Sequence, residues 1–154
     1  MNHENLNLRL ATKADVAEIR MLLNADKLGQ SREDMSIEGL QKYLKAFEAI
    51  KSSPDNQLWV AEIKGKVVGT WQVTFIPYLS RGGNTRCLIE AVRTARDSRG
   101  QGIGRQMMEF ALDQARQHGC VLAQLTTDKV RPDAHRFYQS LGFQSTHEGM
   151  KIHL

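Results

Sequence analysis

The segment that most constrains the fold runs from residue 86 to residue 127, where a glycine-rich turn separates two regular elements. Apolar and β-branched side chains in Arg86–Thr94 predict a strand. The sequence RGQGIG then opens a predicted helix at about 103–118, and Gly119 is the residue type that often follows a helix. Val121–Thr127 predicts a second strand. A strand, a helix and a strand in this order form a βαβ unit, whose two strands are parallel.

The turn Arg99–Arg105 (RGQGIGR) has the chemistry of an anion site. Helix N-termini carry unpaired N–H groups at the positive end of the helix dipole, and glycine lets the backbone approach an anion closely. The dinucleotide pattern GxGxxG would need glycine at position 105, and the Gly-Lys-Ser/Thr triplet of a P-loop is absent from this sequence. The turn therefore predicts a pyrophosphate cradle of another type, and a glycine-rich turn without a ligand is the alternative.

Hydrophobic periodicity predicts the remaining elements. Alternation predicts strands at Leu6–Leu10, Leu58–Ile63 and Lys66–Ile76 and a terminal hairpin over Phe143–Leu154, while helical spacing predicts helices at 13–24, after Ser36 and at Pro132–Leu141. Residues 26–36 are polar and predict a loop. The fold class is therefore α/β (α+β), with a mixed, mostly antiparallel sheet flanked by helices and one βαβ unit.

Four local details follow from the same patterns. Thr12 and Asp15 predict a capping box, and Lys64-Gly65 predicts a two-residue hairpin turn. Val67, Trp71, Val73 and Phe75 are expected on one face of their strand. Ile37, Leu40, Leu44, Phe47 and Ile50 are expected to form one apolar stripe on the helix after Ser36.

Length and composition predict one soluble domain, residues 1–154. Hydrophobic residues make up 41% and charged residues 25%, which excludes global disorder. The polar start MNHENLNLRL has no signal-peptide core, and no apolar run approaches the ~20 residues of a membrane span, so we expect a cytoplasmic protein. The 21 basic and 17 acidic residues are mixed along the chain, which predicts neither a nucleic-acid nor a membrane partner.

Cysteine and histidine spacing predicts no metal site. Cys87 and Cys120 lie 33 residues apart without a CxxC pair, and the five histidines, His3 among them, lack HxxxH or HExxH spacing. Both thiols are expected to be buried and inert.

Three segments together carry a resemblance to a known family. Arg99-x-x-Gly102-x-Gly104 resembles the R/Q-x-x-G-x-G/A acyl-CoA signature of the GNAT superfamily of N-acetyltransferases. The predicted strand 88–94 lies just upstream of it, and Ala134–Phe143 (AHRFYQSLGF) is similar to the A-x-x-x-Y-x-x-x-G-F run of that family. The resemblance covers nearly the whole chain, and it implies a GNAT-like sheet in which the βαβ unit binds acyl-CoA.

The resemblance implies where acetyl-CoA binds as the acyl donor. The two strands of the βαβ unit splay apart in the family, and the pantetheine arm pairs with one of them like an extra strand. The residues implied in cofactor binding are Val92, Arg93 and Thr94 for the arm, and Arg99, Gly100, Gln101, Gly102, Ile103, Gly104 and Arg105 for the phosphates.

Arg131 departs from the family pattern. Members commonly carry asparagine seven residues before the tyrosine, where this chain has Arg131. We expect Arg131 either to replace that asparagine through the cofactor phosphates or to face solvent.

Tyr138 matches the tyrosine with which family members protonate the leaving thiolate. A phenol with an ordinary pKa near ~10 is protonated at neutral pH and can donate. Its alternative role is core packing, because Ala134, Phe137 and Leu141 continue the same apolar stripe.

Glu90 is the candidate general base. It is expected to share a strand face with Leu88 and Val92, and a carboxylate among apolar neighbours is costly unless it is paired or used. Some members carry a glutamate twelve residues before the first glycine of the signature, where Glu90 stands relative to Gly102. A charge on the open side of the sheet, or a binder of a cationic substrate, is the alternative.

The resemblance thus implies an N-acetyltransferase that moves an acetyl group from acetyl-CoA directly to a primary amine. A catalytically silent acyl-CoA-binding sensor or regulatory protein is the alternative. Glu33 and Asp34 are expected near the acceptor entrance, where they would suit a cationic amine. Members are frequently homodimers, which leaves a homodimer open for this chain.

Overall fold

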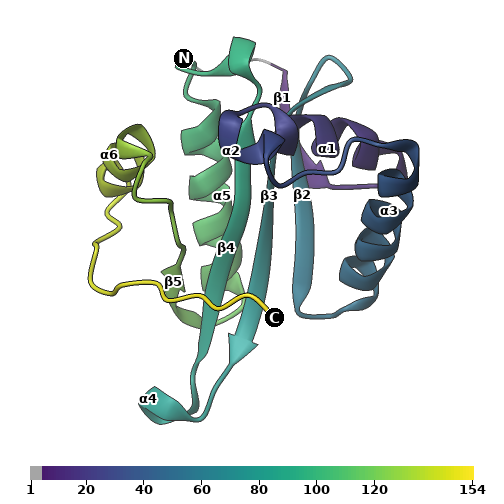
Figure 1. Cartoon of the computed structure of the whole chain (residues 1–154). Helices are drawn as coiled ribbons and strands as arrows, with labels where there is room; N and C mark the ends of the chain where they lie inside the picture. The colour runs from purple at the N-terminus through teal and green to yellow at the C-terminus, as the bar shows by residue number, and fades with distance from the viewer. Residues whose placement is uncertain (1–4) are drawn as a thin grey trace.

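A five-stranded sheet runs through the computed structural model, which describes residues 5–154 (Figure 1). Its spatial order is β1-β2-β3-β4-β5, and all neighbours are antiparallel except β4 and β5. The strands are β1 (Leu6–Leu10), β2 (Asn56–Ile63), β3 (Lys66–Pro77), β4 (Thr85–Thr94) and β5 (Cys120–Gln124). The predicted βαβ unit is confirmed, because helix α5 (Ile103–Gln117) joins the two parallel strands.

Helices cover both faces of this sheet. Helix α5 packs on one face, and α1 (Val16–Asn24) and α3 (Ile37–Ser52) pack on the other (Figure 1). The remaining helical segments are η1 (Lys13–Asp15), α2 (Lys27–Gln30), α4 (Ser80–Gly83), η2 (Arg96–Ser98) and α6 (Pro132–Ser140). No helix within residues 5–154 is both long and apolar enough to cross a membrane.

Each face has its own core. On the α5 face, Trp71, Ile89, Met107 and Met108 are almost fully buried. On the α1 face, Ile19 packs against Val60 and Val67. Burial of these side chains is the main force that fixes the helices on the sheet.

Several local predictions are confirmed. The side chain of Asp15 accepts hydrogen bonds from the backbone N–H and the hydroxyl of Thr12, and the Arg9 guanidinium contributes most to lowering the pKa of Asp15 to about 2. Ser36 caps α3 by accepting from the Gly39 N–H. Lys64 and Gly65 both have positive φ, +50° and +79°, as a tight two-residue hairpin turn requires.

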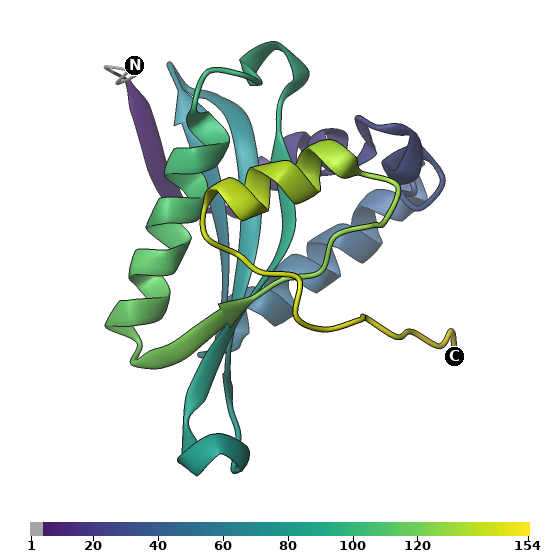
Figure 2. The same ribbon diagram turned by 90° about the vertical axis from the view of Figure 1, so that its left-hand side faces the viewer.

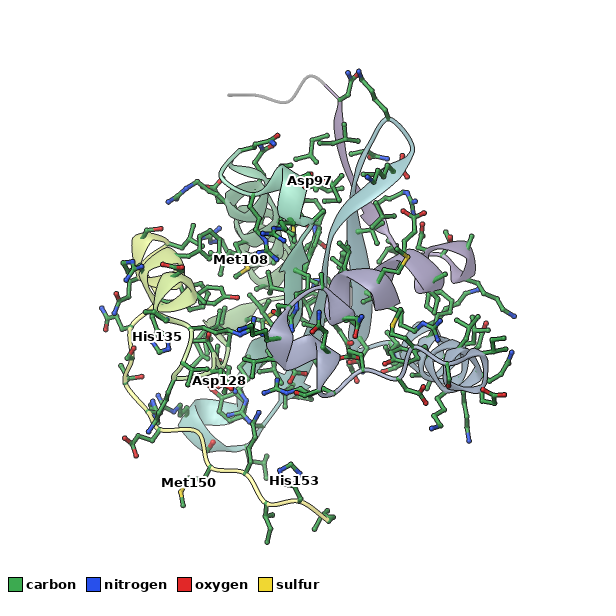
Figure 3. The ribbon with its side chains drawn as sticks, turned by 45° about the horizontal axis from the view of Figure 1, so that its top comes forward. Asp97, Met108, Asp128, His135, Met150 and His153 are labelled. Carbon is green, nitrogen blue, oxygen red and sulfur yellow. The ribbon has the colours of Figure 1, made fainter. Side chains whose placement is uncertain are left out.

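The predicted terminal hairpin is wrong. Past α6, residues 141–154 contain no helix or strand, and the tail runs away from the sheet (Figure 2). Figure 3 places Met150 and His153 along this tail. Met150, Ile152 and Leu154 alternate as strand residues do, but they remain exposed, because alternation makes a strand only where a partner strand supplies hydrogen bonds.

Smaller departures have local causes. The loop 26–36 contains helix α2, and β5 ends at Gln124 instead of residue 127. Ile37 begins α3 but is 85% exposed, so the apolar stripe starts one turn later. A β-bulge interrupts the pairing of β2 with β3, because Ala61 pairs with Gly69 but Glu62 pairs with Val67. Val67 therefore faces α1 and does not share the face of Trp71, Val73 and Phe75, which pack towards α5. His3 lies outside the described residues.

Candidate functional site

Strands β4 and β5 separate halfway along β4. Their pairing runs from Thr85–Cys120 to Leu88–Gln124, while β4 continues to Thr94. Figure 2 shows β4 extending past the end of β5, with α6 lying in front of it. From residue 89 to residue 94, β4 therefore has a strand neighbour only on the β3 side. Two carbonyls of this stretch accept side-chain hydrogen bonds, that of Val92 from Arg93 Nη1 (2.9 Å) and that of Thr94 from Arg99 Nε (3.2 Å). The backbone groups that are bonded neither to β3 nor to these side chains are available to an extended ligand.

A β-bulge redirects the chain inside this open stretch. Glu90 pairs with Gln72 and Arg93 pairs with Thr70, so Ala91 and Val92 together face the single residue Trp71. Ala91 has a φ of +52°, in the left-handed region that non-glycine residues rarely adopt. Bulges of this kind leave one residue outside the ladder and are common beside active sites.

The bulge separates side chains that strict alternation would keep together. Val92 packs into the core on the α5 face. Glu90 and Arg93 instead share the α1 face with Gln72 and Thr70, which are their partners on β3. The prediction that Glu90 and Val92 share one face is therefore wrong, because the extra residue reverses the alternation.

The glycine-rich turn forms an open N-terminus for α5. The first backbone bond onto the turn is donated by the Gln106 N–H to the Gly102 carbonyl (3.1 Å), so the amides of Ile103, Gly104 and Arg105 precede the helical ladder. Among residues 5–154, no side chain caps this helix. Gly102 has a φ of +80° and open space where a Cβ would lie. Three N–H groups without a partner in the helical ladder thus follow a glycine that borders open space, which is the arrangement of an anion site.

Gly104 lies where α5 meets α6 and the end of β4. A Cβ there would be in van der Waals contact with the Phe137 ring (3.4 Å) and the Thr94 hydroxyl oxygen (3.5 Å). The three elements are therefore close neighbours at this point.

The long polar side chains of the turn mainly hold its shape. Arg99 donates from Nε to the Thr94 carbonyl (3.2 Å), and Gln101 donates to the carbonyl of Asp97, which Figure 3 marks in the loop before α5. Arg105 donates to the Ser140 hydroxyl (3.1 Å) and so links α5 to α6. Arg105 also borders an open groove of about 440 Å³ between these helices.

Tyr138 lies where α6 faces the separation of the strands. Its ring packs against Phe137 and Phe143, with ring centroids 5.2 and 5.9 Å apart. Burial raises the pKa of Tyr138, while the guanidinium groups of Arg93 and Arg131 lower it by a smaller amount. No hydrogen bond from its hydroxyl to any residue in the described range is present. The residue therefore packs in the core and also keeps a protonated hydroxyl beside two positive charges.

The structure brings Arg93 and Arg131 to one carboxylate, that of Asp26. Arg131 donates from Nη2 to Asp26 Oδ2 (2.7 Å), and Arg93 Nε lies 3.9 Å from the same oxygen. Oδ1 accepts the Gly29 N–H (2.7 Å) and so caps α2. Burial alone would raise the pKa of Asp26, but this amide and the two guanidinium groups outweigh it and lower the pKa.

Asp26 was missed by the sequence reasoning. Its spacing to Gly29 is a helix-cap pattern, which could have identified α2. Its pairing with Arg131, 105 residues away, has no local signal.

The other candidate carboxylates lie in different surroundings. Glu90 is exposed and has no hydrogen-bonding or ionic partner within residues 5–154. Glu33 accepts the Tyr43 hydroxyl (2.5 Å), and Asp34 accepts from Ser36 and Lys42. Both expected entrance residues are therefore already engaged in local bonds.

The prediction of buried cysteines is confirmed for Cys87 and in part for Cys120. Cys87 is fully buried, and burial raises the pKa of its thiol to about 12. Cys120 is partly buried, and burial raises its pKa as well.

Comparison with known proteins identifies the fold and the family. A crystal structure described as a transcriptional regulator from Bacillus halodurans C-125 is 46% identical, with a TM-score of 0.93 over 97% of this chain and 99% of that chain. A predicted acetyltransferase from Clostridium acetobutylicum, solved with acetyl-CoA, shares the fold at 21% identity, with a TM-score of 0.74 over 96% of each chain.

A curated relative and the family profile agree with this fold. The aminoalkylphosphonate N-acetyltransferase of Salmonella typhimurium is 33% identical over 107 residues, which is 70% of this chain and 69% of that protein. The profile of the acetyltransferase (GNAT) family matches residues 18–143, which include β2 to β5, α5 and the tyrosine of α6. The chain therefore belongs to the acetyltransferase (GNAT) family of N-acetyltransferases.

Proposed function

We propose that the protein transfers an acetyl group from acetyl-CoA directly to a primary amine. The observation that carries this proposal is the meeting of three features: the open edge of β4, the uncapped N-terminus of α5 and the Tyr138 hydroxyl. Acetyl-CoA has a group to match each feature: an amide-rich arm for the strand edge, a pyrophosphate for the helix N-terminus and a thioester sulfur that can accept the proton of the tyrosine.

The chain's own groups then have distinct tasks. The amides of Ile103, Gly104 and Arg105 would hold the pyrophosphate, and the backbone of Val92, Arg93 and Thr94 would pair with the arm. When bound, acetyl-CoA supplies the thioester carbonyl that the amine attacks. A backbone N–H at the bulge, near Val92, would polarise the carbonyl oxygen.

Two side chains would move the protons. As the new C–N bond forms and the C–S bond breaks, the Tyr138 hydroxyl donates a proton to the leaving sulfur. Glu90 accepts, directly or through one water, the proton that the acceptor ammonium must lose before its nitrogen attacks the carbonyl. A Glu90 that only attracts the acceptor is the alternative role.

A second function has one observation in its favour. The structure at 46% identity is described as a transcriptional regulator, which fits an acyl-CoA-binding sensor or regulatory protein. Thiol release from acetyl-CoA over a panel of amines separates the two, because a sensor would bind the cofactor without turnover on any amine. We also propose that the protein is cytoplasmic.

Replacing Gly102 tests the cradle. Gly102→Asp adds a negative charge where the pyrophosphate would lie, so acetyl-CoA affinity should fall at least about tenfold, or ~1.4 kcal/mol, by calorimetry. Gly65→Asp is the matched control, because Gly65 has almost the same φ (+79°) and open space but lies in a distant hairpin turn. Equal affinities in the two folded variants would exclude the cradle.

Removing the hydroxyl of Tyr138 tests the acid. Tyr138→Phe keeps the packed ring, so kcat should fall by roughly 10²-fold while the melting temperature barely changes. Because burial raises the pKa of Tyr138, the protonated acid should persist, and the wild-type rate should show no alkaline loss from this group below about pH 10. Tyr78→Phe, which removes a buried hydroxyl far from the site, should keep full activity. A fully active Tyr138→Phe variant would leave Tyr138 a packing residue only.

Glu90→Gln separates the base from the binder. A lost base should lower kcat/KM, with a smaller loss at high pH where more of the amine is neutral, and should move the acidic limb of the pH–rate profile. If the profile keeps its shape while KM rises and kcat stays near wild type, Glu90 acts by attracting the acceptor.

A further inference from the structure

The cluster of Arg93, Asp26 and Arg131 carries an unbalanced charge. Two guanidinium groups share one carboxylate, with contacts of 2.7 Å from Arg131 and 3.9 Å from Arg93. The side chain of Arg93 is only 18% exposed. It donates from Nη1 to the Val92 carbonyl (2.9 Å), but its buried Nε has no hydrogen-bond partner within residues 5–154. A partly buried positive charge without a full set of acceptors is costly, so an added anion would be stabilised here.

Nearby acidic groups do not supply this anion. Glu33 influences Arg93 only weakly, and its carboxylate accepts the Tyr43 hydroxyl. Asp128 pairs with Arg32 (3.3 Å) and accepts the Val130 N–H. The two guanidinium groups and Asp26, taken by themselves, carry one net positive charge, while Glu33 and Asp128 act on the arginines without a direct contact.

The cluster lies at the reacting end of the site. Arg93 pairs across the sheet with Thr70, on the face covered by α1, while the α5 N-terminus belongs to the opposite face. Both arginines act on the pKa of Tyr138. An anion held between them would thus lie close to the proposed acid and away from the pyrophosphate cradle.

Glu90 adds the complementary charge on the same face. Its pairing with Gln72 puts it on the α1 side of the bulge, three residues before Arg93. A carboxylate and a pair of guanidinium groups on one face match a molecule that carries an ammonium group and an anionic group.

We propose that Arg93 and Arg131 bind an anionic group, a carboxylate or a phosphonate, of the acceptor amine. This inference rests on the proposed transferase function and gives its substrate class. Arg131 then serves the acceptor instead of the cofactor phosphates. The acceptor is an amino acid or an aminophosphonate, and the cationic amine suggested by Glu33 and Asp34 is disfavoured. Asp26 limits the positive charge and holds α2 beside the site.

The substrate preference is the first test. With saturating acetyl-CoA, thiol release is measured for β-alanine, 2-aminoethylphosphonate, neutral ethanolamine and cationic 1,4-diaminobutane. Both anionic amines should exceed ethanolamine in kcat/KM by at least about tenfold, and their ratio to each other distinguishes carboxylate from phosphonate. Equal or better turnover of the neutral and cationic amines would overturn the inference and leave the transferase intact.

Two variants should act in opposite directions. Arg131→Gln should lower kcat/KM for the anionic amines by roughly 10- to 100-fold through KM, with ethanolamine unchanged. Asp26→Asn keeps an oxygen to cap α2 but removes the competing charge, so KM for the same amines should fall. Arg136→Gln, an exposed arginine on the same helix as Tyr138, should change nothing.

The pattern across variants excludes the other roles of these residues. If Arg131 only fastens α2 to α6, both substitutions should weaken every amine equally. If Arg131 holds the cofactor phosphates, Arg131→Gln should weaken acetyl-CoA in calorimetry. Either result would overturn the inference.

A binding measurement separates this inference from the proposed function. Calorimetry of 2-aminoethylphosphonate in the presence of CoA should show binding that Arg131→Gln weakens about tenfold or more. Such binding without turnover of any amine would keep the anion site and contradict the transferase. Absence of binding together with absence of a charge preference would reject the anion site.

Discussion

The separation of β4 from β5 after Leu88 is the feature on which the rest of the site depends. Parallel strands normally continue side by side, because each exposed N–H and C=O group needs a partner. Here the pairing of β4 with β5 stops at Leu88, although β4 continues through residues 89–94, and α6 lies over the opening (Figure 2). The unpaired edge, the α5 N-terminus and Tyr138 meet there because one βαβ unit and the helix that follows it carry all three.

Local signals in the sequence predict most of the helices, strands and turns. The cap at Ser36, the turn at Lys64-Gly65 and the helix after Gly102 each depend on a few neighbouring residues, and each is found in the structure. The bulge at Ala91 has no such signal, because it arises from the register between β3 and β4. The same limit explains the tail, where alternation at Met150–Leu154 is present without a neighbouring strand.

The candidate site divides in the same way. The cradle and Tyr138 follow from motifs that are continuous in the sequence, whereas the cluster of Asp26, Arg93 and Arg131 joins three distant segments. Asp26 shows why such a cluster escapes prediction. One of its oxygens caps α2, which a local pattern indicates, and the other neutralises an arginine that only the fold brings near.

Residue-resolved amide hydrogen exchange, with and without acetyl-CoA, tests the central claim most directly. If the open edge of β4 and the N-terminus of α5 receive the donor, exchange should slow at amides within residues 89–94 and at Ile103, Gly104 and Arg105. Amides in the β1–β2 ladder should keep their rates. Binding of acetyl-CoA that leaves both of these segments unchanged, or protects only other parts of the chain, would contradict the account.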